Sequence, residues 1–518
     1  MKKGFTLIEL LAVILILGII ALIAIPTVNN ILKESRRGAF QSTITNIEKA
    51  IEQKCTTEQI KNQEITSTYT ITEGVISPSL DIKGELPDGV IYVNNECAVS
   101  LTLSDNNFTG TKDYEGELVI TDGSSGPSMY VEGILNGADP VLSANLIPVT
   151  IKNDGTVKEA DLNSKWYSYA EKKWANAVIL KENGKIEEDG TILEDSIESY
   201  FVWIPRFKYK LFDMGNYNSL INGQPSEFIN KTIEIVFENK NTPVSVGTDV
   251  NDYHSHPAFQ AFDTNGFWVG KFETTGSTTN QQIKPNQTAI GNLNVKTIFE
   301  LSYNYKRTND SHMMKNTEWG AVAYLTLSKY GLGKDVNPNN NTNFITGYSL
   351  VEGATSSGTD SSVTLPYNTE TGYLASTTGN ITGIYDLAGG INEYVAGFLS
   401  DNLGSSGFIE DPTITYGTKY FDEYPSNSTV TNYSNSILGD GIKEFGPFYY
   451  YKDPNDITGS EGPHNAWFGS YSFFIEPDCP WLVRGGAASN IHSSGILEFY
   501  NLFGFELSLI GYRIVLAN

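Results

Sequence analysis

The sequence predicts an α+β protein with a long N-terminal helix, a small antiparallel β head and a large, irregular further domain. An apolar run over residues 5–25 continues as apolar residues spaced by three and four up to about Lys54, which indicates a helix. Residues 68–120 alternate between apolar and polar side chains, as strands do. The chain holds 48 glycines and 20 prolines with few other helical patterns, which favours a body rich in strands and loops.

Length and charge bound the organisation and the partners. With 518 residues the chain exceeds the usual size of one core, so two or three domains are expected. A formal net charge of -25 at pH 7 and a sequence pI of about 4.6 argue against nucleic acid as a partner. Five histidines leave little room for a histidine-based metal centre.

The first 25 residues predict a membrane-spanning segment. Two lysines precede Gly4, and Glu9 is the single charge between Phe5 and Ile25. That length is about what a helix needs to cross the hydrocarbon core, and the preceding lysines keep the N-terminus on the cytoplasmic side. Nothing after Ile25 has the pattern of a secretory cleavage site, so the segment is expected to stay with the protein.

The residues from Lys3 to Glu9 resemble the leader and mature start of type IV pilins and type II secretion pseudopilins. The resemblance implies a leader over residues 1–4 that a prepilin peptidase cuts after Gly4, and N-methylation of the new terminal residue Phe5. It also implies that Glu9 pairs with the N-terminus of a neighbouring pilin subunit, and a carboxylate inside an apolar helix does require such a partner. The expected location is a single-pass membrane protein before assembly and an extracellular pilus afterwards. The alternative is a plain membrane anchor with one stray acid.

The predicted pilin helix covers residues 5–54, of which 5–25 form the membrane or pilus-core segment. It would be about 75 Å long at 1.5 Å per residue, with a kink at Pro26. Its second half is expected to pack on a globular head through a stripe of apolar side chains: Ile31, Leu32, Phe40, Ile44, Ile47 and Ile51.

The β head is predicted over residues 55–120, with strands at 67–72, 89–93, 97–103 and 117–120. Cys55 at the helix end and Cys97 at a strand start are well placed for one disulfide, which an oxidising compartment outside the membrane would preserve. The alternative is two free thiols.

Residues 121–136 are predicted to include a linker because Gly, Ser and Pro dominate 121–127, and a further domain is expected over residues 137–518. Seven segments from Phe201 to Leu516 together resemble, in family order, the formylglycine-generating-enzyme (sulfatase-modifying factor) domain of the C-type-lectin fold superfamily. The resemblance implies a large, irregular C-type-lectin-like domain. These segments are 201–206, 256–259, 266–273, 314–324, 379–395, 481–486 and 511–516.

No catalytic role is expected for this domain. The enzymes of that family oxidise a substrate cysteine with copper held by two C-terminal cysteines, whereas this region contains Cys479 alone. Asp386 and Glu393 are interpreted as structural hydrogen-bonding groups rather than a catalytic pair. No cofactor is predicted, although Ca²⁺ binding, known in some relatives, stays open without an assigned site. Cys479 is interpreted as a buried core thiol, with an intermolecular disulfide as the alternative.

The candidate ligand-binding surface lies between Gly486 and Gly511, in a segment rich in aromatic and aliphatic residues. Exposed apolar patches on a rigid scaffold commonly mark contact with a partner. The alternative is a buried C-terminal hairpin. In a related group of C-type-lectin-fold proteins this interval carries variation from diversity-generating retroelements, so a diversified binding protein is a further hypothesis. The expected binding residues are Ser489, Asn490, His492, Glu498, Phe499, Tyr500, Asn501, Phe503 and Glu506.

Together these observations predict a minor or tip type IV pilin-like subunit that displays an adhesin domain for a protein or glycan ligand on the cell surface. A large cap on every subunit would crowd a filament, which argues against a major pilin. The alternative is a structural pseudopilin of a type II secretion or DNA-uptake machine whose cap binds another component. A surface enzyme is the third hypothesis.

Overall fold

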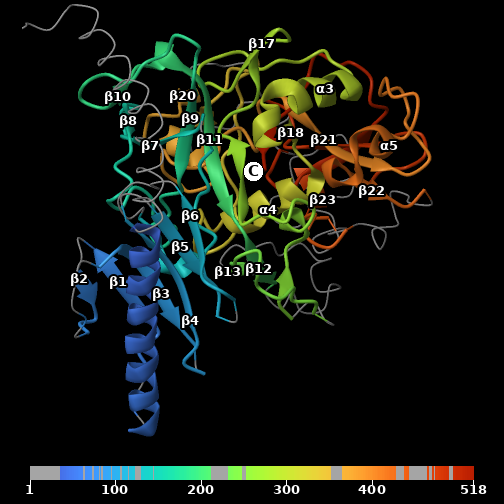
Figure 1. Ribbon diagram of the computed structural model, residues 1–518. Coiled ribbons are helices and arrows are strands. Elements are labelled where there is room, and N and C mark those ends of the chain that lie inside the picture. Colours follow the sequence, from blue (N-terminus) through green and yellow to red (C-terminus); the bar gives the residue numbers. More distant parts are fainter. Residues whose placement is uncertain are drawn as a thin grey trace, which may run out of the picture. The chain divides into compact units, whose positions relative to one another are not determined.

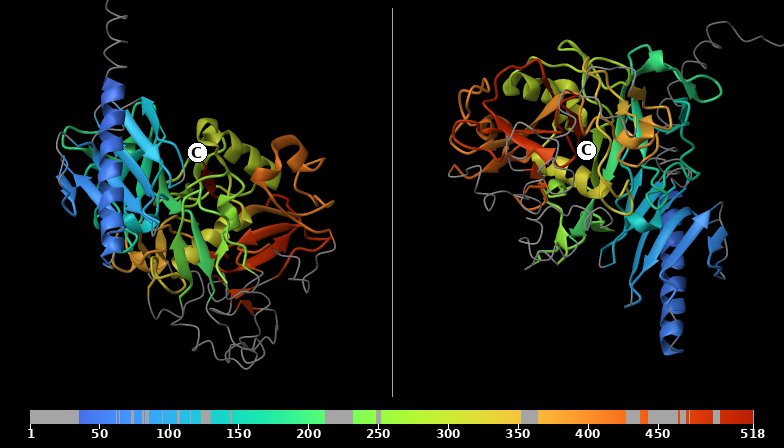
Figure 2. Two further views of the ribbon diagram at one scale, coloured as in Figure 1. Left: turned by 60° about the horizontal axis from the view of Figure 1, so that its bottom comes forward. Right: turned by 180° about the vertical axis from the view of Figure 1, so that it is seen from behind.

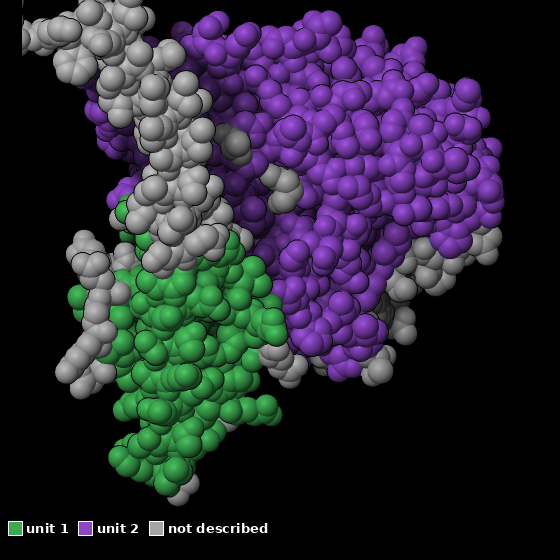
Figure 3. Space-filling view, in the orientation of Figure 1, with its two compact units in different colours: residues 1–131, 162–165 green, residues 132–161, 166–518 purple. Residues whose placement is uncertain are grey.

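The computed structural model divides the chain into two compact units (Figure 3). Unit 1 contains residues 1–131 and 162–165, and unit 2 contains residues 132–161 and 166–518. The change of unit at residue 131 falls inside the 121–136 range expected to be a linker, five residues before the expected domain start. The described residues are 36–61, 63, 65–72, 75–80, 82, 86–94, 96–105, 108–114, 116–122, 130–143, 145–211, 232–247, 252–351, 364–426, 437–442, 464–465, 470–471, 473–488 and 494–517.

In unit 1 a helix over residues 36–60 packs on one antiparallel sheet (Figure 1). The strand order is β2-β1-β3-β4-β5-β6. The helix continues six residues beyond the expected end at Lys54, because its buried stripe extends through Cys55 to Glu58. The strands are β1 Thr68–Thr72, β2 Val75–Ser77, β3 Asp88–Val93, β4 Val99–Ser104, β5 Phe108–Lys112 and β6 Val119–Asp122.

The core of unit 1 forms between the helix stripe and one face of the sheet. Phe40, Ile44, Ile47 and Ile51 recur at helical spacing and are all buried. Strand β5 passes so close to the helix that a Cβ atom on Gly110 would lie 2.3 Å from Cδ1 of Ile44. A side chain at that position would force Ile44 to change its rotamer, so glycine allows the close packing of helix and sheet seen here.

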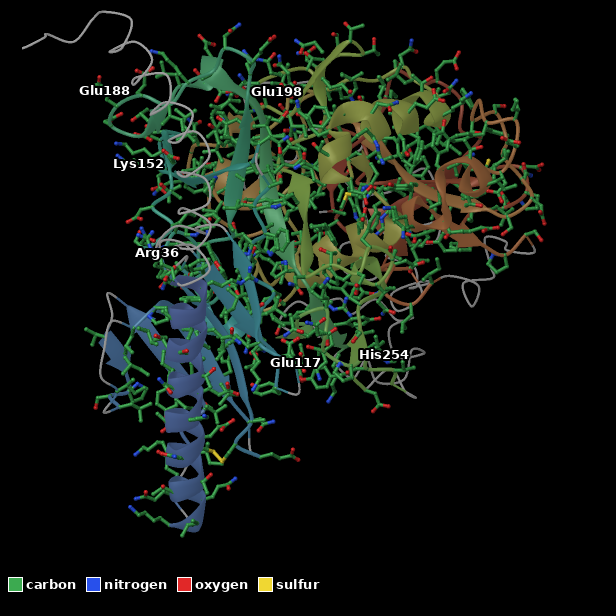
Figure 4. All side chains as sticks on the ribbon, in the orientation of Figure 1. Arg36, Glu117, Lys152, Glu188, Glu198 and His254 are labelled. Carbon is green, nitrogen blue, oxygen red and sulfur yellow. A yellow bond between two sulfur atoms is a disulfide. The ribbon has the colours of Figure 1, made fainter. Side chains whose placement is uncertain are left out.

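The expected disulfide between Cys55 and Cys97 is present, and Figure 4 shows it beside the helix. The two Cα atoms lie 5.6 Å apart, within the range that a disulfide bridges. The bond joins the helix to the residues just before β4, and it closes a loop with a sequence separation of 42.

Unit 2 is built around an eight-stranded sheet of order β10-β8-β7-β9-β11-β15-β28-β18. A second sheet, order β22-β21-β25-β26 with β27 beside β21, contains the C-terminal strands, drawn in orange and red in Figure 2. The strands of the first sheet are β7 Ile147–Ile151, β8 Val157–Glu159, β9 Asn176–Leu180, β10 Thr191–Ile192, β11 Ile197–Pro205, β15 Gly266–Gly270, β18 His312–Met313 and β28 Ile514–Leu516; those of the second are β21 Asn392–Leu399, β22 Asp422–Tyr424, β25 Trp481–Arg484, β26 Phe499–Leu502 and β27 Ile510–Gly511.

Smaller elements complete unit 2. One three-stranded sheet, of order β13-β12-β14, and three strand pairs, β16-β17, β19-β20 and β23-β24, are formed by β12 Phe207–Lys210, β13 Glu234–Phe237, β14 His254–Ser255, β16 Thr275–Ser277, β17 Asn280–Gln282, β19 Tyr348–Leu350, β20 Thr364–Pro366, β23 His464–Asn465 and β24 Ser470–Tyr471. The α-helices are α3 Val295–Tyr305, α4 Asn316–Thr326 and α5 Pro412–Tyr416, and the 3-10 helices are η1 Gly133–Leu135, η2 Glu194–Ser196, η4 Pro257–Phe259, η5 Arg307–Asn309, η7 Gly372–Ala375 and η8 Thr418–Tyr420.

Tryptophans anchor the main sheet of unit 2. Trp203 on β11 pairs with Trp268 on β15, and their ring centroids lie 5.3 Å apart. Each indole N–H donates to a backbone carbonyl, Trp203 to Ala138 and Trp268 to Val141, so both rings are buried without an unpaired donor. Helix α4 is buried along its whole length, so it belongs to the core rather than to the surface. The structure therefore confirms a mixed α+β protein that is mostly sheet with few helices.

We expect loss of the disulfide to destabilise unit 1 by about 4 kcal/mol, the chain-entropy value for a loop of this size. The variant is the double substitution Cys55→Ser with Cys97→Ser. The measurement is urea-dependent hydrogen exchange of residues 36–60. Cys479→Ser is the control and should leave that exchange unchanged. Equal protection of the helix in the double variant and the wild type would show that the bond contributes nothing.

We also expect a pH effect from Asp335, a buried residue whose Oδ1 accepts hydrogen bonds from the N–H groups of Val336 and Ile496. Burial raises the pKa of its carboxyl to about 7. The folded state therefore binds more protons than the unfolded state between about pH 4 and 7, and stability from this group falls as pH rises through that window.

The substitution Asp335→Asn keeps the accepting oxygen and removes the charge. The free energy of unfolding of the variant minus that of the wild type should increase by about 3 kcal/mol from pH 5 to pH 8. All seven tryptophans follow residue 165, so urea titration read by tryptophan fluorescence reports on unit 2. Asp195→Asn, at an exposed carboxyl, is the control. A constant difference between wild type and Asp335→Asn across this pH range would contradict the assignment.

Candidate functional site

The N-terminal motif and part of the candidate surface lie outside the described residues. These are Gly4, Phe5 and Glu9, together with Ser489, Asn490 and His492. Among the residues that are described, no helix is both long and apolar enough to cross a membrane. The segment expected to do so, residues 5–25, is not among them.

Two residues of the candidate surface, Glu498 and Phe499, are buried, which corrects the sequence-based assignment. Glu498 is 3% exposed and Phe499 is 0% exposed. In the β25–β26 ladder Phe499 pairs with Arg484, which places its side chain in the core of unit 2. The turn before β26 is fixed by a hydrogen bond, in which the indole N–H of Trp319 donates to the carbonyl of Ile496 at 2.6 Å. For these two residues the alternative of a buried hairpin is the correct one.

The middle of the segment is half-buried and used internally. The side-chain amide of Asn501 donates to the carbonyl of Phe474 at 2.7 Å, so this donor is not available to a ligand. Burial raises the pKa of Tyr500 well above its ordinary value, so its phenol stays neutral. Both side chains therefore contribute to the packing of strand β26 and offer little to a ligand.

Residues 503–509 form an exposed loop whose backbone is fixed to unit 2. The N–H groups of Ser405, Val295 and Asn292 donate to the carbonyls of residues 503, 504 and 507 at 2.7, 3.1 and 2.9 Å. The side chains of Phe503 and Leu509 are each 44% exposed, and Glu506 is exposed. The loop thus presents two apolar side chains and one carboxylate from a rigid backbone, as a binding surface requires.

Two exposed apolar residues near this region were not singled out from the sequence. Ile409 is 95% exposed and Ile414 is 76% exposed, both in the stretch that follows Ser405. A signal was present, because neither isoleucine belongs to an apolar period that would bury it; Ile409 lies in a loop and Ile414 in the short helix α5.

The carboxylates of the expected structural pair belong to one buried network. Glu393 accepts two hydrogen bonds from the guanidinium of Arg513, at 2.6 and 3.2 Å. Asp386 accepts from the side-chain amide of Asn339 and from the N–H of Gly347, each at 2.9 Å. Burial raises the pKa of Glu393, and it raises the pKa of Asp386 to about 6. The geometry is that of structural hydrogen bonding.

Cys479 is half-buried in a turn, so it is not the fully buried core thiol favoured from the sequence. Burial and the nearby carboxylates of Glu476 and Asp478 raise the pKa of its thiol. The other two cysteines of the chain are joined to each other. In the part of the chain that the structure describes, no three His, Cys, Asp or Glu side chains gather as metal ligands would.

Comparison with known protein families matches residues 1–25 to the prokaryotic N-terminal methylation motif. No curated protein matches the chain. The expected likeness of residues 201–516 to the sulfatase-modifying-factor domain and to the C-type-lectin fold stays a prediction. The motif is that of type IV pilin-like proteins, and it implies processing by a prepilin peptidase, a membrane-anchored precursor and assembly with other pilin subunits. The chain therefore carries the N-terminus of a pilin-like or pseudopilin surface subunit.

Proposed function

We propose that this protein is a minor or tip subunit of a type IV pilin-like filament that displays unit 2 as a ligand-binding domain. The observation that carries the proposal is the methylation motif at residues 1–25 in a chain whose second unit has its own large core. The motif supports a role in assembly with other pilin subunits. Unit 1, a helix on an antiparallel sheet, has the architecture expected of a pilin head.

Within this proposal Gly4 is the leader cleavage position, Phe5 is the methylated terminus and Glu9 is the assembly residue. Unit 2 acts by binding rather than by catalysis, and it requires no cofactor. Its ligand is a protein or glycan of another surface. The loop 503–509 supports this role, because the exposed side chains of Phe503, Glu506 and Leu509 stand on a backbone held by hydrogen bonds.

The assembly role predicts that Glu9→Gln lowers the amount of this protein in filaments sheared from cells by at least about tenfold. A lost ion pair in a low-dielectric environment costs more than the 1.4 kcal/mol that a factor of ten represents. Mass spectrometry of the membrane fraction should still show cleavage after Gly4. Wild-type incorporation of the variant would remove the assembly role from Glu9.

The binding role predicts that Phe503→Ser combined with Leu509→Ser reduces attachment of cells to their target surface while filament number stays constant. The control is Val246→Ser, a residue that is 82% exposed on a different loop. Attachment assays and electron microscopy of filaments give the two readings. If attachment is unaffected, the loop is not the binding surface. If deletion of the gene removes the filaments themselves, the protein is a structural pseudopilin instead.

A further inference from the structure

Arg484, the last residue of β25, is a fully buried cation with no hydrogen-bond partner among the residues that the structure describes. Its guanidinium carbon lies 5.7 Å from the ring centroid of Trp319 and 5.8 Å from that of Phe499. Its Nε, Nη1 and Nη2 atoms have no hydrogen-bond acceptor. Arginine carries five N–H donors and stays charged in proteins, and buried groups of this kind are almost always paired. An unpaired guanidinium in the core therefore indicates a missing acceptor.

No carboxylate in the described part of the chain lies within ion-pair distance of this guanidinium. Asp440 is close enough to favour the charged form of Arg484, but its oxygens accept from the N–H groups of Ile437 and Ile442 and from the phenol of Tyr424. Burial outweighs these charges and lowers the pKa of Arg484 to about 10, so the group remains a cation at neutral pH.

Glu498 carries a second buried polar group in the same region that lacks a hydrogen-bond partner among the described residues. Its Oε2 atom is buried and has no hydrogen-bond partner within the described ranges of the chain. Burial raises the pKa of Glu498 well above its ordinary value, which favours the protonated carboxyl, a form that can donate a hydrogen bond. The ladder places the two residues close in space, because Arg484 pairs with Phe499, the residue that follows Glu498.

The Glu498 carboxyl packs directly against the backbone at Gly486, which only a residue without a Cβ atom permits. A Cβ atom on Gly486 would lie 2.0 Å from Oε2 of Glu498 and 2.5 Å from the hydroxyl oxygen of Ser494. Its φ of +73° is also a conformation that favours glycine. Any side chain here would clash with this oxygen, so glycine is what allows Glu498 to stay in place.

We propose that Arg484 and Glu498 form a binding site for a small monocarboxylate inside unit 2. The two carboxylate oxygens would accept from the fork of Arg484, and the protonated Glu498 would donate a third hydrogen bond. A single negative charge balances the guanidinium, whereas a phosphate dianion would add an excess negative charge near Asp440. The site is separate from the exposed loop 503–509, and the proposal does not depend on adhesion.

The test uses the full-length protein in detergent, in Tris-chloride buffer at pH 7. Sodium acetate is titrated against sodium chloride at equal ionic strength, and the thermal midpoint of unit 2 is read by tryptophan fluorescence. We expect acetate to raise the midpoint by at least about 2 °C in a saturable manner, because a ligand that binds only the folded state stabilises it.

Matched variants separate binding from a general salt effect. Arg484→Met should abolish the acetate response, and Glu498→Gln should keep it because the amide still donates. Lys173→Met removes one exposed cation and should behave as the wild type. The wild-type titration decides the question even if Arg484→Met fails to fold. Absence of an acetate-specific rise overturns the proposal, and a larger rise with phosphate than with acetate excludes a monocarboxylate as the ligand.

Discussion

Unit 2 depends on the buried ion pair between Arg513 and Glu393. Besides its two hydrogen bonds to Glu393 on β21, Arg513 donates to the carbonyls of Gly270 on β15 and of Tyr385. One guanidinium thus joins the eight-stranded sheet to the C-terminal sheet. The pair contributes more to the positions of the sheets than to net stability, because the cost of burying two charges offsets most of their attraction. Strands β25 and β26 belong to the sheet that this ion pair positions, and they lead to the exposed loop 503–509.

Much of unit 1 could be predicted from the sequence, because the signals there are local. The stripe from Phe40 to Ile51 has helical spacing, and strands β1, β3, β4 and β6 alternate as expected. Strands β2 and β5 were missed. Strand β2 has only three residues, and β5 contains Gly110, which normally argues against a strand but here fits beneath Ile44. The contact that explains this glycine forms only when the helix has packed on the sheet, so the sequence alone does not reveal it.

The candidate site was predicted less well, because burial in unit 2 is decided by distant partners. Nothing around Glu498 in the sequence shows that a strand ending at Arg484 will lie beside it, or that Trp319 will hold the preceding turn. Phe503 and Leu509 carry the same kind of side chain as Phe499, yet they are exposed. The loop that bears them is fixed through its backbone, by hydrogen bonds from three other segments that no local pattern in the sequence reveals.

Strand β28 has a consequence for how the chain leaves the cell. It lies between β15 and β18, and Leu516 on β28 pairs with Trp268, 248 residues earlier (516 − 268 = 248). The strands of unit 1 all pair within residues 68–122, so that unit can form as soon as it emerges. The main sheet of unit 2 cannot close until residue 516 has crossed the membrane, and contacts so distant in sequence form slowly. Until β28 arrives, β15 has no partner on the edge that β28 covers, and an unpaired edge of an apolar strand is prone to aggregation during export.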